Sequence, residues 1–170
     1  MIGLAIAAVV VLYAIILYNG LVKARQVKEE AWSGIDVQLK RRADLIPNLI
    51  ETVKGYASHE KETLEKVVEL RNRAQAEGLL SQALCRIFAL AEAYPDLKAN
   101  QNFAELQETL ETLENEIQMS RRYYNGAARD LNVKVESFPS NLVASLFKFL
   151  KAPYFEIENP ADRAVPTVKF

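Results

Sequence analysis

An uncharged apolar run opens the chain, and the apolar pattern then continues at helical spacing. Residues 2–17 (IGLAIAAVVVLYAIIL) carry no charged side chain, and the first charge that follows is Lys23. Because an α-helix rises about 1.5 Å per residue, residues 2–22 would span roughly 30 Å, the thickness of the hydrocarbon core of a membrane. No basic n-region and no A-x-A cleavage site accompany the run, so we predict an uncleaved transmembrane helix over residues 1–22.

The apolar stripe does not stop at the predicted membrane edge. It continues at a spacing of three or four residues through Ala24, Val27, Ala31, Ile35, Leu39 and Leu45. This spacing predicts that the membrane helix runs on as a stalk and becomes the first helix of a bundle at about Trp32. Pro47 interrupts the stripe and leaves two outcomes, a kink near Ala43 in a continuous helix or a restart with Asp44 as the cap. We favour the continuous helix, with its kink at Pro47.

Three further amphipathic segments follow, each bounded by a capping residue or a proline. We expect helices over residues 59–93, 103–137 and 141–150, capped by Ser58, by Asn100 or Asn102, and by Ser140. The second helix has a weak place from Asn72 to Leu79, where apolar side chains are few and Gly78 disfavours a helix.

These elements predict an all-α fold in which an N-terminal transmembrane helix continues into a long antiparallel helical bundle. The bundle would have three long helices and a short C-terminal helix. We expect a membrane anchor over residues 1–22, a cytoplasmic bundle over residues 23–150, and an irregular tail over residues 151–170. The three prolines of the tail make it irregular, and its apolar residues predict that it packs on the bundle or on a neighbouring subunit.

Charge and cysteine content indicate the location of the predicted bundle. Lys23, Arg25 and Lys28 follow the apolar run closely and nothing basic precedes it, so the positive-inside rule places the N-terminus outside and the body in the cytoplasm. Cys85 is the only cysteine, which fits a reducing compartment, and its apolar neighbours predict a buried thiol. The formal net charge of −1 argues against nucleic acid as a partner.

Polar side chains stand on or beside the apolar stripe of the predicted stalk. The candidate residues are Asp36, Gln38, Arg41, Arg42, Asp44 and Asn48. An arginine inside a bundle must be paired, and Glu114, Asn115 or Gln118 of the third helix could pair with Arg42. Two interpretations stay open with equal weight. The residues form a buried polar network or a contact site for another subunit, or they are an ordinary solvated face.

Phenylalanines towards the C-terminus are candidates for contact with a membrane surface or with another subunit. They are Phe147, Phe149, Phe155 and Phe170. The short helix over residues 141–150 combines two of them with Lys148 and is followed by Lys151, a pattern that could lie on a membrane surface. We favour the alternative that this helix packs over the open end of the bundle.

Sequence motifs for catalysis are missing. His59 is the only histidine, so the chain has neither a zinc-protease helix nor the paired Glu-x-x-His motifs of a di-iron bundle. It also lacks the glycine-rich phosphate loops and the nucleophile elbow. We therefore expect no catalytic residues, no metal and no cofactor.

The chain resembles the LemA family of bacterial membrane proteins over nearly its whole length. The resemblance is carried by YNGLVKARQVKEEAWSGIDVQLKRRADLIPNLIETVKGYASHEKETLE, LSQAL, AEAYPDLKANQNFAELQETLETLENEI, RRYYN, FPSNLVA and PTVKF. Two departures stand out. The polar segment between Arg73 and Leu80 is shorter than is usual, and Cys85 stands where a glycine is common.

This resemblance implies a location and only an outline of function. It implies a single-pass protein of the bacterial inner membrane with a short external N-terminus, and it carries no established catalytic residues. A relative in magnetosome biogenesis suggests membrane organisation. We expect a non-enzymatic membrane scaffold that contacts the lipid bilayer and forms homo-oligomers. The alternative is an adaptor for another inner-membrane protein, such as a protease.

Overall fold

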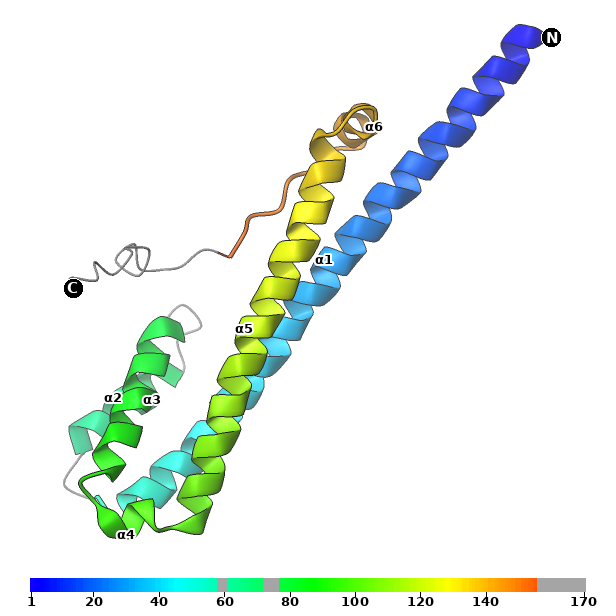
Figure 1. Cartoon of the computed structure of the whole chain (residues 1–170). Coiled ribbons are helices and arrows are strands. Elements are labelled where there is room, and N and C mark those ends of the chain that lie inside the picture. Colours follow the sequence, from blue (N-terminus) through cyan, green and yellow to red (C-terminus); the bar gives the residue numbers. More distant parts are fainter. Residues whose placement is uncertain (58–60, 72–76, 156–170) are drawn as a thin grey trace, which may run out of the picture. The chain divides into compact units, whose positions relative to one another are not determined.

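All regular structure in the described part of the chain is helical. The computed structural model describes residues 1–57, 61–71 and 77–155. In these residues the helices are α1 (Ile2–Lys54), α2 (Lys61–Arg71), α3 (Glu77–Ala91), α4 (Pro95–Lys98), α5 (Gln101–Glu136) and α6 (Ser140–Leu146) (Figure 1). The predicted all-α class, with a long apolar N-terminal helix leading into a helical body, is confirmed.

The helices group into two compact units. Unit 1 contains residues 1–35 together with residues from Gln118 onward, and unit 2 contains residues 36–117. The long helices α1 and α5 each contribute one segment to unit 1 and another to unit 2.

Unit 1 begins with the exposed apolar segment at the N-terminal end of α1, which we call the bare apolar segment. Side chains 1–13 are exposed, and α1 contains, near its N-terminal end, the stretch that within the described residues is long and apolar enough to cross a membrane. Burial of α1 side chains by the rest of unit 1 begins near Leu21, which is fully buried in a small core with Ala144 and Phe149. Lys134 of α5 donates from Nζ to the carbonyl oxygen of Gly20 at 3.1 Å, which ties α5 to α1 just below the bare segment.

Helix α1 passes Pro47 without ending. It extends as one helix from Ile2 to Lys54, so the continuous helix that we favoured is confirmed and a restart capped by Asp44 is wrong. Proline removes one backbone hydrogen bond, but Ile46, Leu49 and Ile50 beside it are buried in the core of unit 2. Their burial holds the helix together through the weak point, because tertiary packing rather than propensity supplies most helical stability. The kink at Pro47 stays a prediction.

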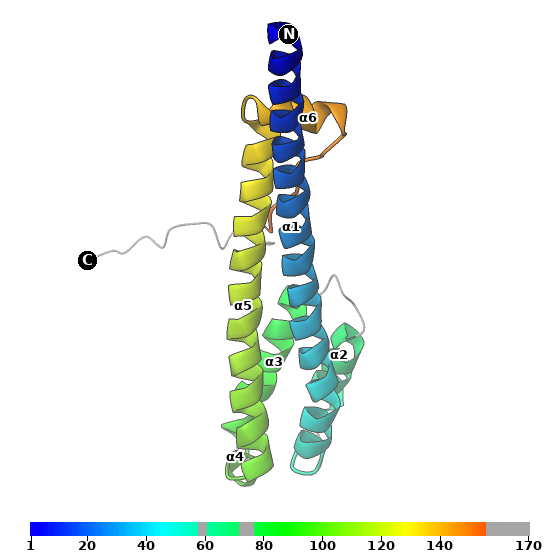
Figure 2. The ribbon, with the colours of Figure 1, turned by 90° about the vertical axis from the view of Figure 1, so that its right-hand side faces the viewer.

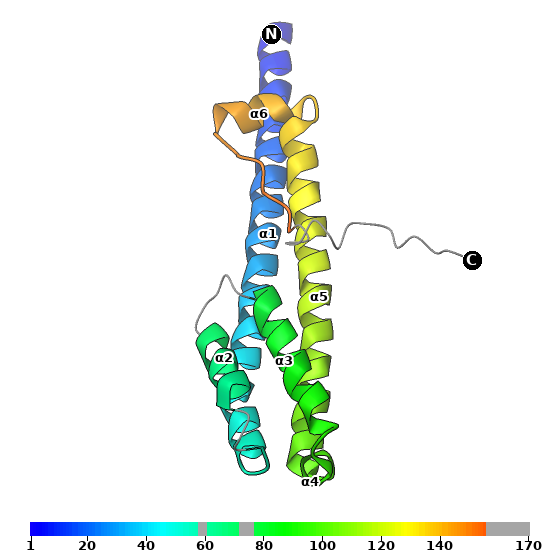
Figure 3. The ribbon, with the colours of Figure 1, turned by 90° about the vertical axis from the view of Figure 1, so that its left-hand side faces the viewer.

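The single second helix predicted over residues 59–93 is wrong. The chain instead forms α2 and α3, which pack against each other as separate helices (Figure 3). Each is amphipathic, with Leu64 and Val67 buried on α2 and Leu84 and Ile87 buried on α3. Two separate short helices place both apolar stripes in one core, which one continuous helix could not do.

The core of unit 2 joins these stripes to α1, α4 and α5. Its buried members are Ile46, Leu49, Ile50, Val53, Ala57, Leu64, Val67, Leu80, Ala83, Leu84, Ile87, Ala91, Leu97, Phe103 and Leu110. Of the two predicted caps for α5, Asn100 is the one used, because its Oδ1 accepts the backbone N–H of Phe103 at 3.0 Å. The predicted cap Ser58 lies outside the described residues.

The end of unit 1 differs from the prediction in two ways. Ser140 is not a side-chain cap for α6, because its hydroxyl bonds back to the carbonyl oxygens of Lys134 at 2.7 Å and Ser137 at 2.9 Å. The hydroxyl therefore donates to carbonyl groups at the C-terminal end of α5, which have no partner within that helix. Helix α6 also ends at Leu146 rather than at residue 150, and Lys148 has the left-handed φ of 55° that stops a helix.

A pair of neighbouring valines on α2 tests the packing of unit 2. Val67 is 0% exposed and Val68 is 44% exposed. We expect Val67→Ala to lower the free energy of unfolding by about 2 kcal/mol, through lost burial and a residual cavity. The matched control Val68→Ala should change it by less than about 0.5 kcal/mol. Denaturant unfolding of full-length protein in detergent measures both. Equal effects would show that α2 does not pack as described.

Candidate functional site

A buried arginine is the centre of the polar site in unit 2. Arg42 is 3% exposed, and its Nη1 donates to Oε2 of Glu114 at 2.8 Å and to Oγ of Ser81 at 3.2 Å. Ser81 Oγ also donates to the same carboxylate at 3.4 Å. The three side chains come from α1, α3 and α5, so one carboxylate and one hydroxyl fix three helices in register.

The ion pair is asymmetric in burial. The Arg42 side chain is almost fully enclosed, whereas Glu114 is 39% exposed and reaches solvent. The Nε of Arg42 is buried and has no hydrogen-bond partner. The arginine therefore bears most of the desolvation cost and depends on Glu114 for compensation, while Glu114 alone would stay hydrated.

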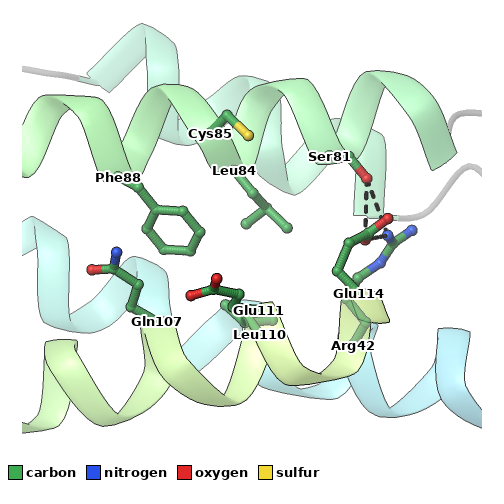
Figure 4. Close-up of a pocket in the computed structure, with 9 residues that line it drawn as sticks. All are labelled: Arg42, Ser81, Leu84, Cys85, Phe88, Gln107, Leu110, Glu111 and Glu114. Atoms are coloured by element: carbon green, nitrogen blue, oxygen red, sulfur yellow. Dashed lines mark hydrogen bonds and ion pairs between the residues drawn. The ribbon is translucent and has the colours of Figure 1, made fainter. Parts of the chain in front are cut away.

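A pocket adjoins this cluster between α3 and α5 (Figure 4). It has a volume of about 250 Å³ and is lined by Arg42, Ser81, Leu84, Cys85, Phe88, Gln107, Leu110, Glu111 and Glu114. Figure 4 shows the apolar side chains in the middle and the ion pair at one end, with Gln107 and Glu111 reaching from α5 towards α3. Such a pocket favours an apolar group with a polar or cationic neighbour.

The thiol of Cys85 is exposed beside this pocket, so the predicted burial is wrong. The apolar stripe of α3 takes Leu84 and Ile87 into the core, and Cys85 lies off that stripe. Apolar neighbours in sequence misled the prediction, because the neighbours of a helical residue along the chain do not share its face.

The other predicted polar residues of α1 lie mostly on the surface. Asp36, Arg41, Asp44 and Asn48 are exposed, and Gln38 is half-buried. Arg41 donates from Nη1 to Gln38 at 2.8 Å and to Glu116 of α5 at 3.0 Å. Arg42 is therefore buried and paired, as the interpretation of a buried polar network expected, while its neighbours are mostly exposed on the single chain. A contact with another subunit at these exposed neighbours stays a prediction. Sequence reasoning named Glu114 and missed Ser81 and Glu116.

A second cluster lies in unit 1, where the first residues of the tail run along α5. The rings of Trp32, Tyr124 and Phe155 lie 5.2–5.3 Å apart in pairs, with Phe155 stacked on Trp32. The Tyr124 hydroxyl donates to the carbonyl oxygen of Pro153 at 3.1 Å. Burial raises the pKa of Tyr124, so this hydroxyl stays protonated and able to donate at neutral pH.

Two asparagines of α5 hold the tail by its backbone. Asn132 accepts the N–H of Ala152 at 2.7 Å and donates to its carbonyl oxygen at 2.9 Å. Asn125 makes the same two bonds with Phe155, at 2.8 and 3.0 Å. The two asparagines are seven residues apart on a helix, a rise of about 10.5 Å, and their partners are three residues apart in an extended segment, a rise of about 10 Å. The two distances match, so both asparagines can bind the tail at once. Sequence reasoning missed this pair, although two asparagines seven apart beside an apolar stripe were a usable signal.

The four candidate phenylalanines have different surroundings. Phe149 is buried, with the Arg25 guanidinium 5.2 Å from its ring centre. Phe147 is 55% exposed although its ring centre lies 4.7 Å from that of Tyr18. Phe155 packs in the aromatic cluster, and Phe170 lies outside the described residues. Within those residues, no group of three His, Cys, Asp or Glu side chains could hold a metal ion.

The sequence of the chain is similar to a known protein family and to several known proteins. The model of the LemA family matches residues 31–170. The chain belongs to the LemA family. Protein LemA of Metamycoplasma hominis is 25% identical over 149 residues, which cover 81% of this chain and 68% of the relative.

Magnetosome proteins form a second group of relatives. Magnetosome protein MamQ 1 of Paramagnetospirillum magneticum is 29% identical over 92 residues, 54% of this chain. MamQ of Magnetospirillum gryphiswaldense is 22% identical over 186 aligned positions, 88% of this chain. The alignment with MamQ 1 spans only 34% of that relative's length. Family and relatives agree with a membrane-associated protein, and none of these names is that of an enzyme.

Substitutions in the ion pair should have unequal effects. We expect Glu114→Gln to lower the free energy of unfolding by about 2–3 kcal/mol, because it leaves Arg42 charged and buried without a counter-ion. Arg42→Met should cost less, about 1 kcal/mol, since it removes the buried charge and leaves a carboxylate that water can reach. The double variant should resemble Arg42→Met alone. Denaturant unfolding measures the cycle, and additive effects would show that the two residues are not coupled.

The asparagine contacts predict a local release of the tail. Asn132→Ala leaves the backbone groups of Ala152 without partners in a buried site, so we expect a loss of about 2 kcal/mol. Asn125→Ala is the matched control at a half-buried site, with an expected loss of about 1 kcal/mol. Hydrogen exchange should show the Ala152 amide deprotected by the first substitution. An amide that stays equally protected would contradict the assigned bonds.

Proposed function

We propose that this LemA-family chain is a non-enzymatic scaffold of the bacterial inner membrane that assembles with copies of itself. The observation that carries the proposal is the continuity of α1, which runs from the bare apolar segment into the cores of both units without a break. A flexible tether would let a domain act independently of the membrane, whereas a continuous helix transmits the position of the anchor to the body.

The surface of unit 1 supports self-assembly. Met119 and Tyr123 are four residues apart on α5, so they lie on one helix face, and both are more than half exposed. An exposed apolar pair on a helix is a typical contact for another helix. The magnetosome relatives are named after a bacterial organelle, which is consistent with a role in organising membranes. The external N-terminus and cytoplasmic body are part of this proposal and rest on the positive charges after the apolar run.

Mass measurement tests self-assembly. Light scattering of full-length protein in detergent should give a multiple of the 19.2 kDa chain mass. The double substitution Met119→Glu, Tyr123→Glu should shift the protein to the mass of one chain, because it places like charges on the facing surfaces of two copies. Val68→Glu on α2 is the control for an exposed apolar residue elsewhere and should leave the mass unchanged. A wild-type protein that is a single chain at all concentrations contradicts self-assembly.

The pocket of unit 2 favours one alternative, an adaptor that binds another membrane protein such as a protease. Its apolar middle and the carboxylate of Glu111 would accept an apolar side chain beside a basic one, since Glu114 is already paired with Arg42. Cys85 lies at the pocket, so a thiol-linked photo-cross-linker attached there reports what approaches it. In native membranes, chain-to-chain adducts favour the scaffold and adducts with one second protein favour the adaptor. Cys85→Ser should give neither.

A further inference from the structure

The segment that ends unit 1 presents an apolar face to the outside. We call residues 138–150, which contain α6, the collar. Its exposed apolar residues are Phe138 (79%), Leu142 (62%), Leu146 (75%), Phe147 (55%) and Leu150 (81%). A soluble surface rarely gathers so many large apolar side chains in so short a segment. The residues buried on the inner side are Ala144 and Phe149, with Val143 packed against them. Of the exposed set, Phe147 also contacts α1, through Tyr18.

The collar is attached to α1 where the membrane-spanning run ends. Its inward residues share a core with Leu21, and the rings of Phe147 and Phe149 lie 4.7 and 5.8 Å from that of Tyr18. The uncharged run of α1 ends at Val22, and Lys23 is its first charged residue. When α1 spans a bilayer, Tyr18 to Val22 therefore lie at the boundary between acyl chains and headgroups, and the collar is held at that same depth.

The direction of α6 suits this depth. It lies across α1 rather than along it, and both side views show this (Figures 2 and 3). A helix that crosses a spanning helix runs in the plane of the membrane surface. This is the direction adopted by interfacial amphipathic helices, which bury one apolar face among the headgroups and upper acyl chains.

The charges around the collar are those that a membrane surface tolerates. The only charged residue from Phe138 to Leu150 is Lys148. Lys151 follows it and pairs with Glu136, and Arg25 of α1 lies over the Phe149 ring. No carboxylate lies within the collar sequence itself, so the apolar face can enter lipid without burying an anion.

From these observations we propose that the collar is a second membrane contact, inserted into the lipid interface of the leaflet from which the body projects. Its occupant is the bilayer, which covers the exposed leucines and phenylalanines and neutralises Lys148 with headgroup phosphates. The proposal rests on the membrane anchoring in the proposed function and adds a surface to it. The sequence favoured packing of this helix over the bundle, and the inward residues of the collar do pack on α1 and α5. The proposal concerns the other face of the collar, which carries the outward leucines.

Spin labels on the full-length chain in vesicles of phosphatidylcholine and phosphatidylglycerol test the collar. In a Cys85→Ser background, single cysteines replace Leu142 and Leu146 in turn. Power saturation compares collisions with oxygen, which concentrates in lipid, and with a water-soluble nickel chelate. Both collar labels should show high oxygen and low nickel accessibility.

Two control positions on α1 make the result interpretable. Val10→Cys reports the spanning segment and should read as lipid. Val37→Cys is also an exposed apolar position, but it lies fifteen residues beyond Val22, about 22 Å further along the helix, and should read as water.

Each outcome has a distinct meaning. If Val10 reads as lipid and the collar labels read as water, the collar proposal is overturned while the anchor stands. Collar labels shielded from both reagents also overturn it, since they indicate cover by protein, either a second copy or residues of this chain. If Val10 reads as water, membrane anchoring itself fails, and the collar proposal fails with it.

Discussion

The continuity of α1 is the constraint on which the rest of the structure depends. One helix carries a bare apolar segment, the contacts of the collar, the aromatic cluster at Trp32 and the buried Arg42. One helix can pass through such different surroundings only if the side chains of each segment suit what surrounds that segment. The N-terminal segment carries apolar residues that suit lipid, and the later segments carry residues that suit a protein core. Its weakest point, Pro47, falls where Ile46, Leu49 and Ile50 are buried, so the local defect coincides with strong packing.

The two units solve the problem of holding α5 against α1 in different ways. Unit 2 uses a broad apolar core, in which Arg42 is the buried charge among the side chains that the structure describes, and a carboxylate on another helix compensates it. Unit 1 has a smaller apolar core and relies on rings and on side-chain amides that bind backbone. In unit 2, a shift of α5 along α1 would separate the arginine from its carboxylate, and a buried arginine without a counter-ion is costly. In unit 1, such a shift would misalign the hydrogen bonds of the side-chain amides, which are directional.

How much could be predicted from the sequence depended on whether the signal was periodic. The extents of α1 and α5 followed from their apolar stripes, and Glu114 followed from the rule that a buried arginine needs a counter-ion. The division into α2 and α3 did not, because periodicity records which face is apolar and not whether the chain turns back. Ser81 was missed because a serine on a helix usually faces solvent, and only the approach of α1 gives its hydroxyl a role. To predict the exposure of Cys85, one would have to know which side of α3 faces the core.

The asparagine contacts also determine how the chain can vary. Asn125 and Asn132 bind the backbone of Phe155 and Ala152 and not their side chains. Most substitutions at Ala152 would therefore keep its two bonds, within the limits of its burial. A change of length would not, because three extended residues match seven helical ones and four do not. Variation among related chains should accordingly conserve the spacing between these tail residues more strictly than their identity, and insertions should fall outside residues 152–155.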